Sequence, residues 1–146
     1  MHSHLSIANT LLNRIVQAVQ KSDSERAIHL LKKYPKWLSA TDEMALNLRA
    51  GVLYYAIQYS CAPLVAFALS FAASPDIHFY RLYGSTPIAM AIDKNAKDMI
   101  PLLYPKCNKK FALHAAVESR QQLVVAALRE KFSFSPKLLQ HLGLQS

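Results

Sequence analysis

Two residues of this chain have the side-chain types of a nucleophile and its general base. Cys107 and His114 are seven residues apart, and a thiolate beside an imidazole can attack an electrophile. No third group that would orient the histidine and no oxyanion-binding pattern accompanies them in the sequence. Cys61, the other cysteine, has no partner at metal-ligand spacing. We therefore interpret both cysteines as reduced thiols in an intracellular compartment.

The sequence lacks the other short patterns that carry catalysis or cofactor binding. His29, His78 and His141 are scattered and form no H-E-x-x-H motif. Three glycines cannot build a phosphate-binding loop of the G-x-x-x-x-G-K-[ST] type. Carboxylates are few, and Asp93 and Asp98 are interpreted as solvated helix surface. We expect a protein that is not an enzyme and that has no cofactor and no metal site.

Side chains typical of protein interfaces are concentrated in residues 76–83. This segment contains Phe79, Tyr80, Arg81 and Tyr83. Aromatic residues and arginine are enriched at binding hot spots, so we expect Tyr80, Arg81 and Tyr83 to be exposed. Phe79 either belongs to the same surface or is buried beneath it and seals the core.

A second candidate surface comes from residues in two other segments. Tyr55 and Tyr59 are four residues apart, which makes them neighbours on the surface of a helix. Met90 and Lys94 occupy the corresponding positions, between the apolar ones, of the next helical segment. Together these side chains would form an aromatic and sulfur-containing patch beside residues 76–83. The alternative is that the tyrosines pack against an adjacent helix.

A pattern that recurs four times must position these segments. Each copy has a branched apolar residue, an alanine three positions later and another branched residue directly after it, all on one helical face. The copies are Ile15-Ala18-Val19, Leu53-Ala56-Ile57, Ile88-Ala91-Ile92 and Leu113-Ala116-Val117, at offsets of 38, 35 and 25 residues. The alanine lets neighbouring helices approach closely, and a second apolar stripe follows each copy. The sequence therefore predicts stacked helix pairs that share one core.

The third copy lies in residues 84–92, Gly-Ser-Thr-Pro-Ile-Ala-Met-Ala-Ile, which resemble the T-P-L-H-x-A signature of an ankyrin repeat. The fourth copy keeps the histidine of that signature as His114. The resemblance implies an all-α ankyrin-repeat solenoid of stacked helix-turn-helix pairs, with irregular or missing β-hairpin fingers. It also implies that His114 makes structural hydrogen bonds between adjacent loops. A single domain, residues 1–146, would hold repeats at about 7–38, 48–80, 84–108 and 111–132 and a capping helix at 136–143.

The chain departs from the family pattern in its turns. Where an ankyrin repeat has glycine after the first helix, this chain has Ser22, Ser60, Asn95 and Arg120. Because only asparagine among these tolerates a left-handed backbone well, we predict that the other three turns are built differently. Pro101 predicts a short or kinked second helix in the third repeat.

The resemblance also identifies where the fingers should be. Residues 76–83 correspond to the one full-length finger. The fourth repeat follows the third after 25 residues, about eight fewer than the 33-residue ankyrin repeat, so its finger is missing. We expect a direct turn through residues 105–108 in place of it.

The family resemblance and the charge together indicate a binding function. Ankyrin-repeat proteins bind other proteins through finger tips and a concave helix face, without a cofactor, which implies a non-catalytic adaptor or inhibitor. The chain has 17 basic and 9 acidic residues, and from Lys106 onward seven are basic and two acidic, so we expect a partner with an acidic surface.

Nucleic acid is the competing partner, but lysines 106, 109 and 110 are expected in a turn away from the aromatic segment. A third, less favoured interpretation is self-association through an apolar C-terminal end that contains Leu138, Leu139, Leu142 and Leu144.

Residues 50–75 carry no charge, which raises the question of a membrane span. Pro63 falls where a second helix would begin, a position that proline favours, and Gln58, Ser60 and Ser70 interrupt the apolar run. We interpret the segment as a buried central helix pair and expect no membrane span. The protein should be intracellular and soluble. The small, irregular array resembles both eukaryotic adaptor modules and the ankyrin proteins that intracellular bacteria deliver into host cells. The second resemblance would place the protein in a host cytoplasm.

Overall fold

The computed structural model describes residues 4–71, 76–94, 96, 98–103, 108–118 and 120–145, with side chains for all of these except 4–6, 76–78 and 111. Every regular element in this part of the chain is a helix, so the predicted all-α class is confirmed. The described helices are α1 (His4–Gln20), α2 (Ser24–Lys32), α3 (Lys36–Ser39), α4 (Glu43–Gln58), α5 (Ala62–Leu69), α6 (Asp76–Tyr83), α7 (Pro87–Asp93), α8 (Ile100–Leu103), α9 (Lys109–Glu118), α10 (Gln122–Lys131) and α11 (Pro136–His141).

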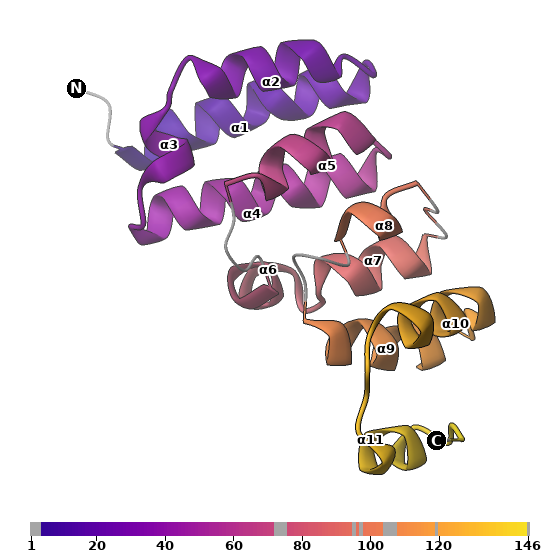
Figure 1. Cartoon of the computed structure of the whole chain (residues 1–146). Helices are drawn as coiled ribbons and strands as arrows, with labels where there is room; N and C mark the ends of the chain where they lie inside the picture. Colours follow the sequence, from indigo (N-terminus) through magenta and orange to yellow (C-terminus); the bar gives the residue numbers. More distant parts are fainter. Residues whose placement is uncertain are drawn as a thin grey trace.

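Most of the helices form antiparallel pairs that follow one another in a row (Figure 1). The pairs are α1–α2, α4–α5, α7–α8 and α9–α10. The first helices contact each other in sequence, α1 with α4, α4 with α7 and α7 with α9. Among the second helices, α2 contacts α5 and α5 contacts α8. The result is a two-layered stack in which α3 and α6 connect successive pairs and α11 lies at the C-terminal end.

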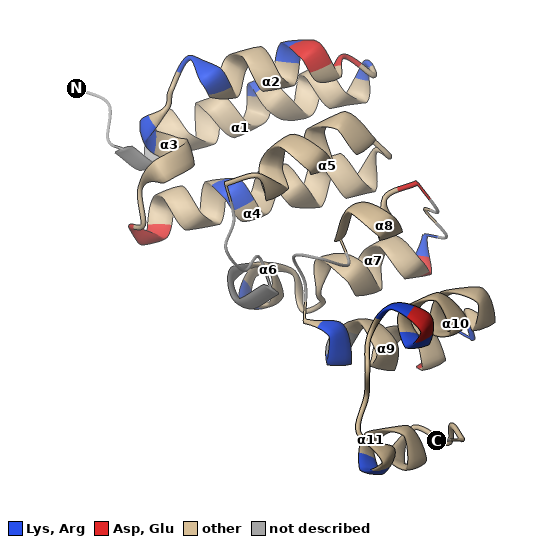
Figure 2. Cartoon of the chain, in the orientation of Figure 1, with Lys and Arg blue, Asp and Glu red and all other residues tan. Residues whose placement is uncertain are grey.

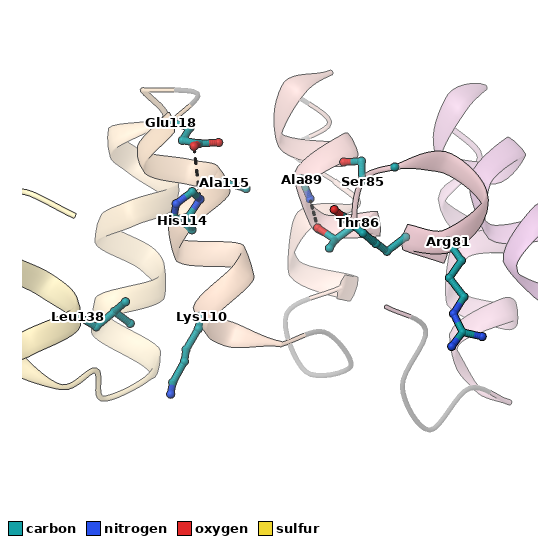
Figure 3. Close-up of a pocket in the computed structure, with 11 residues that line it drawn as sticks. Arg81, Ser85, Thr86, Ala89, Lys110, His114, Ala115, Glu118 and Leu138 are labelled. Carbon is teal, nitrogen blue, oxygen red and sulfur yellow. Dashed lines mark hydrogen bonds and ion pairs between the residues drawn. The ribbon is translucent and has the colours of Figure 1, made fainter. Parts of the chain in front are cut away.

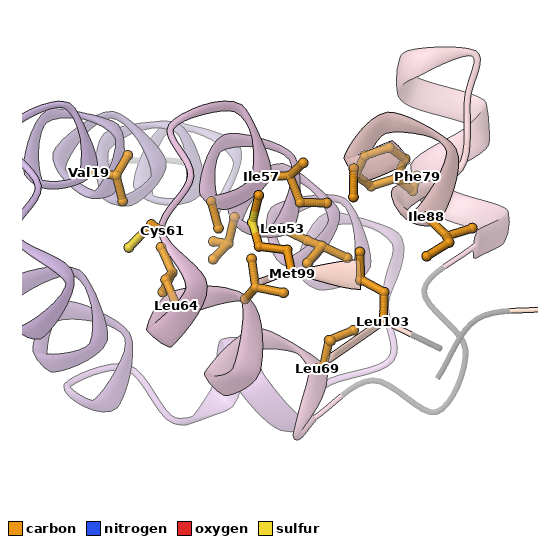
Figure 4. Close-up of a cluster of buried hydrophobic side chains, with 14 of the residues drawn as sticks. Val19, Leu53, Ile57, Cys61, Leu64, Leu69, Phe79, Ile88, Met99 and Leu103 are labelled. Atoms are coloured by element: carbon orange, nitrogen blue, oxygen red, sulfur yellow. The ribbon is translucent and has the colours of Figure 1, made fainter. Parts of the chain in front are cut away.

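The recurring apolar pattern forms the core of this stack. The four alanines, Ala18, Ala56, Ala91 and Ala116, are all buried. The branched residues around them are buried too, apart from Val117, which is half-buried near the end of α9. Figure 4 shows the central part of the core, where Leu53 and Ile57 of α4, Ile88 of α7 and Met99 and Leu103 meet. One shared cluster therefore runs through successive pairs, as the pattern predicts.

The turns that join the two helices of a pair share one backbone geometry. A left-handed residue stands in three of them: Ser22, Ser60 and Arg120, with φ of 59°, 55° and 55°. The next amide donates to the carbonyl oxygen of the buried alanine: Asp23 to Ala18, Cys61 to Ala56 and Gln121 to Ala116, at 2.9, 2.7 and 2.9 Å. Ala96 makes the equivalent bond to Ala91 at 2.9 Å, while Asn95 itself lies outside the described residues. This is the Schellman arrangement of a helix C-terminus.

The prediction that turns without glycine would be built differently was therefore wrong. The left-handed residue also donates its own amide to a carbonyl three residues back, for example Ser60 to Ile57 at 3.1 Å. The motif thus pairs two carbonyl groups that would otherwise end the helix unsatisfied. Those bonds and the packing of the pair outweigh the cost of a left-handed L-residue, about 1–2 kcal/mol.

Residues 76–83 were expected to be a finger and instead form helix α6. The reason is visible in the residue types, since the segment has no internal glycine or proline and places Phe79 and Tyr83 four apart on one helical face. Both rings pack on Tyr54 of α4, with centroid distances of 6.0 Å for Phe79 and 4.0 Å for Tyr83. Gly84 ends the helix with φ 69°, and its amide donates to the Tyr80 carbonyl at 2.8 Å. A hairpin would have sent alternate side chains to opposite faces and lost this anchor.

The uncharged residues 50–75 lie in the middle of the stack. Figure 2 shows no charged residue on α5, whereas Lys and Arg occur on the helices at both ends. Most of the second half of α4 is buried, as are Leu64, Val65 and Leu69 of α5, and Pro63 lies in the first turn of α5. The predicted buried helix pair is confirmed. Among the described residues, the structure contains no helix with the length and hydropathy that a membrane span requires.

The C-terminal third agrees with the sequence in part. The described helix at Pro101 is short, as predicted, with only four residues in α8. The direct turn expected through residues 105–108 lies mostly outside the described residues. Helix α11 begins after Ser135, whose hydroxyl accepts a hydrogen bond from the Leu138 amide at 3.2 Å, which matches the predicted cap to within two residues. Of the four apolar leucines at this end, Leu139 is buried. The other three, Leu138, Leu142 and Leu144, are half-buried against the core.

Candidate functional site

A groove of about 720 Å³ opens where α6, α7, α9 and α11 come together (Figure 3). Side chains from all four helices line it, although the helices are separated in the sequence. The lining residues are Tyr80 and Arg81 of α6, Gly84, Ser85 and Thr86 of the turn to α7, Ala89 of α7, Lys110, His114, Ala115 and Glu118 of α9, and Leu138 of α11. We call this the groove.

Small side chains leave the groove open. Gly84 ends α6, and Thr86 starts α7 two residues later as its N-cap. The Thr86 hydroxyl accepts a hydrogen bond from the Ala89 amide at 3.3 Å, a bond drawn in Figure 3. This cap fixes the direction of α7 and places Ala89 in its first turn, across from Ala115 of α9. Neither alanine carries atoms beyond Cβ that would fill the space between the two helices.

Helix α9 presents a polar stripe to the groove. Lys110, His114 and Glu118 follow one another at intervals of four residues, so they lie along one helix face. His114 Nδ1 lies 3.6 Å from Glu118 Oε1, which is an ion pair when the imidazole is protonated. Figure 3 shows Lys110 and the His114–Glu118 pair along α9 on one side of the groove, and Arg81 extending from α6 on the opposite side. The α9 side of the groove therefore has a polarity, with the Lys110 cation at one end and the Glu118 carboxylate at the other.

Within the part of the chain that the structure describes, His114 makes no bond to an adjacent loop, which was the structural role expected for it. Its side chain is half-exposed and its ion-pair partner is on the same helix. The reason is the start of the helix. Helix α7 begins one residue before Ile88, whereas α9 begins four residues before Leu113, so α9 has an additional N-terminal turn. This extra turn places the histidine inside the helix.

The segment 76–83 supplies two of the predicted surface residues. Tyr80 is 60% exposed and Arg81 is exposed, as expected, and both line the groove. Phe79 is fully buried, so it seals the core and offers no surface to a partner. The exposure predicted for Tyr83 was wrong, because its ring stacks on Tyr54 with an interplanar angle of 14°. Burial, and next the neighbouring Tyr55, raises the pKa of Tyr83 to about 12.

The second predicted surface is not part of the groove. Tyr55 is half-buried and meets Tyr54 edge to face, with centroids 5.1 Å apart. Tyr59 is 41% exposed, and its hydroxyl accepts a hydrogen bond from Gln20 Nε2 of α1 at 2.9 Å. Met90 is half-buried and Lys94 is exposed just beyond α7. None of these four side chains lines the groove, so the structure does not bring them together with Tyr80 and Arg81.

A comparison of the chain with protein-family models, with curated proteins and with solved structures gave no match. The groove is therefore interpreted from its own residues.

Sequence reasoning missed the contribution of Lys110 of α9 to this site. Lys109 and Lys110 were expected in a turn away from the aromatic segment, and they instead form the first turn of α9. Asn108 starts that helix, because its side-chain Oδ1 accepts a hydrogen bond from the Lys110 amide at 2.9 Å. An asparagine directly before an apolar periodic run is a helix-start signal, and it could have placed Lys110 in the same helix as His114.

Proposed function

We propose that the protein is a non-catalytic protein-binding module of the ankyrin-repeat type, an adaptor or an inhibitor that binds its partner in the groove. The observation that carries the proposal is the position of Tyr80 and Arg81, two exposed side chains of hot-spot type at the edge of a hollow with a floor of small residues. A volume of about 720 Å³ is enough to enclose side chains of a partner segment.

The ankyrin-repeat assignment is supported by features that the pairs have in common. Each pair has a buried alanine in its first helix, and in each case that alanine's carbonyl accepts the amide five residues later. At the start of α7, Thr86 is the N-cap and Pro87 lies in the first turn. The Thr-Pro order of the ankyrin signature suits these two roles, because threonine favours the N-cap and proline the first helical position. Helix α6 takes the place of a finger beside the first helices. On this proposal, the groove corresponds to the concave binding face of the family.

The test is capture of a partner by matched variants. The groove variant is Tyr80→Ala/Arg81→Ala. Its control, Tyr34→Ala/Lys33→Ala, removes an exposed tyrosine and an adjacent cation at the far end of the stack. We expect the parent and the control to retain the same protein from a nuclease-treated lysate, and the groove variant to lose it. Circular dichroism and the unfolding temperature establish that all three are folded. Equal retention by the two variants would remove the groove from consideration.

Single-stranded nucleic acid is a second candidate, favoured by one specific observation. Tyr80, Arg81 and Lys110 line the same groove, and an aromatic ring beside cations is the arrangement that stacks a base and holds its phosphates. Binding of a fluorescein-labelled oligothymidine, lost at high salt and in Tyr80→Ala, would support this function. The carboxylate of Glu118 in the same groove argues for the protein partner.

A further inference from the structure

Helix α9 brings two opposite charges to the groove at a fixed separation. Lys110 lies in its first turn and Glu118 is its last residue, and both side chains are exposed. They are eight residues apart on one helix, so a rise of 1.5 Å per residue separates their backbone positions by about 12 Å. Figure 3 shows the two side chains at opposite ends of the α9 side of the groove, with His114 between them. A ligand that lies along α9 therefore meets a cation and then, about two helical turns later, a carboxylate.

Both charges are accessible to a ligand. The neighbouring Lys109 has its Nζ 5.8 Å from the centre of the Phe132 ring and does not line the groove, whereas Lys110 does. No carboxylate of the described residues forms an ion pair with Lys110. Glu118 lies 3.6 Å from His114 of its own helix, and its side chain is 69% exposed. Because an exposed ion pair contributes little stability, a basic group of a ligand can bind the Glu118 carboxylate without disturbing the fold.

The surface between these charges favours a helix as the occupant. Ala115 lies between them along α9, Ala89 of α7 lines the same groove, and α11 adds Leu138. An extended peptide would leave backbone amide and carbonyl groups facing these methyl groups, and each unpaired group costs free energy. A helix pairs its own backbone groups, and the short alanine side chains allow it to approach closely.

The separation of the charges sets the sequence pattern of such a helix. About eight of its residues cover 12 Å when it lies along α9. Side chains at positions i, i+3, i+4 and i+7 share one face of a helix. The two outer positions would then meet the charged ends of α9, and the two inner positions would meet the apolar surface.

We infer that the partner inserts an amphipathic α-helix into the groove, with an acidic side chain at Lys110, apolar side chains on Ala89 and Ala115, and a basic side chain at Glu118. The acidic and basic residues are seven positions apart in the partner. This inference rests on the proposed function and specifies the class of its partner. A nucleic acid fits less well, since its regularly spaced phosphates would place negative charge beside Glu118.

A swap variant, Lys110→Glu/Glu118→Lys, tests the order of the charges without changing their sum. It places an acidic residue in the first turn of α9 and a cation in its last turn, which favours the helix, so we expect it to fold. The control, Arg14→Glu/Glu25→Arg, exchanges two exposed charges at the far end of the stack. Circular dichroism and the unfolding temperature establish that both variants are folded.

The probes are helical peptides selected from a phage-displayed library against the whole chain. The library holds sixteen-residue sequences built from good helix formers, with the residues of one face randomised. The best peptide is synthesised with fluorescein in three forms: as selected, with its acidic and basic residues exchanged, and with a proline between them. Fluorescence anisotropy gives the Kd of each form for the parent, the swap variant and the control.

We expect the parent to select peptides with an acidic and a basic residue seven positions apart and large apolar residues between them. The selected peptide should bind the swap variant at least about tenfold more weakly than the parent, while the control remains within about threefold. The exchanged peptide should instead prefer the swap variant. Since both proteins have the same net charge, and so do both peptides, this reversal reports direct contacts. The proline form should bind the parent at least about tenfold more weakly, because proline breaks a helix.

Several outcomes would overturn the inference. If the parent selects peptides without the charge pair, and these lose affinity in Tyr80→Ala, the partner class is wrong and the proposed function stands. The same conclusion follows if the selected and exchanged peptides bind the parent equally, if the swap variant and the control lose the same affinity, or if the proline form keeps its Kd. If no peptide is enriched above phage background, the inference fails, and binding of an oligothymidine in place of a peptide would remove the proposed function as well.

Discussion

Replacing the left-handed residues of the turns with glycine should stabilise the protein. The changes are Ser22→Gly, Ser60→Gly and Arg120→Gly, all at exposed positions with φ between 55° and 59°. An L-residue in this conformation costs about 1–2 kcal/mol, whereas glycine adopts it without a Cβ clash. Glycine also makes the unfolded chain more flexible, which costs about 0.5–1 kcal/mol.

The net gain is therefore about 0.5–1 kcal/mol at each turn. The turns lie in different helix pairs and share no hydrogen bond, so their effects should add, to about 1.5–3 kcal/mol in the triple variant. For a chain of this length, that corresponds to a rise in the unfolding temperature of roughly 3–12 °C. Urea and thermal denaturation followed by circular dichroism measure both quantities.

Two control substitutions separate the backbone effect from the loss of a side chain. Ser60→Ala removes the hydroxyl but keeps the Cβ, and should gain nothing. Ser70→Gly places glycine at φ −65°, where no strain is relieved, and removes a hydrogen bond from the Ser70 hydroxyl to the Phe67 carbonyl. It should destabilise the protein by about 1 kcal/mol. The reasoning is refuted if Ser60→Gly is no more stable than Ser60→Ala.

Two further predictions concern the anchor of α6. Phe79→Ala removes a fully buried ring and should lower the free energy of unfolding, measured by urea denaturation, by about 3–5 kcal/mol. The neighbouring Tyr80→Ala should change it by less than about 0.5 kcal/mol, because Tyr80 is exposed. Similar losses in the two variants would contradict the packing described. With the pKa of Tyr83 raised to about 12, the folded state keeps the phenolic proton between pH 10 and 12 while the unfolded chain loses it, so the free energy of unfolding falls as pH rises through this range. The fall should be smaller in Tyr83→Phe, and an identical pH profile for that variant would count against the burial of the hydroxyl.

The core of the fold could be predicted from the sequence because it depends on residue spacing alone. An alanine flanked by branched residues at helical intervals identifies a buried face without any knowledge of its neighbours, and Ala56 and Ala91 are buried as expected. Val117 is half-buried because α9 belongs to the last pair, where no further first helix covers that face. Periodicity does not report this end effect.

The turns and α6 could not be predicted by the same reasoning. Serine and arginine disfavour a left-handed backbone, which argued against this turn geometry. At Ser60 and Arg120, the backbone hydrogen bonds of the turn and the packing of each helix pair outweigh that preference. At residues 76–83, the expectation of a finger concealed a helical signal, the four-residue spacing of Phe79 and Tyr83. That spacing becomes decisive only once Tyr54 is known to lie opposite.

Only some of the groove residues could be predicted from the sequence, because the groove is formed by helices that are far apart along the chain. Tyr80 and Arg81 could be recognised from their types, but Lys110 and Glu118 join them only through the stacking of α9 on α7. Leu138 reaches the groove from a helix near the end of the chain. A site assembled from several helix pairs has no local sequence motif.

The stacked arrangement affects how the molecule opens as well as how it binds. Successive pairs contact mainly their neighbours, so the C-terminal pairs can unfold locally while α1–α5 remain folded. The groove spans α6, α7, α9 and α11 and so lies within these C-terminal units. A ligand held there joins these units and opposes their separate opening. Amide hydrogen exchange should then slow in α9 and α10 when the groove is occupied, and stay unchanged in α1. Ligand binding would thus make more of the helix pairs unfold together as one cooperative unit.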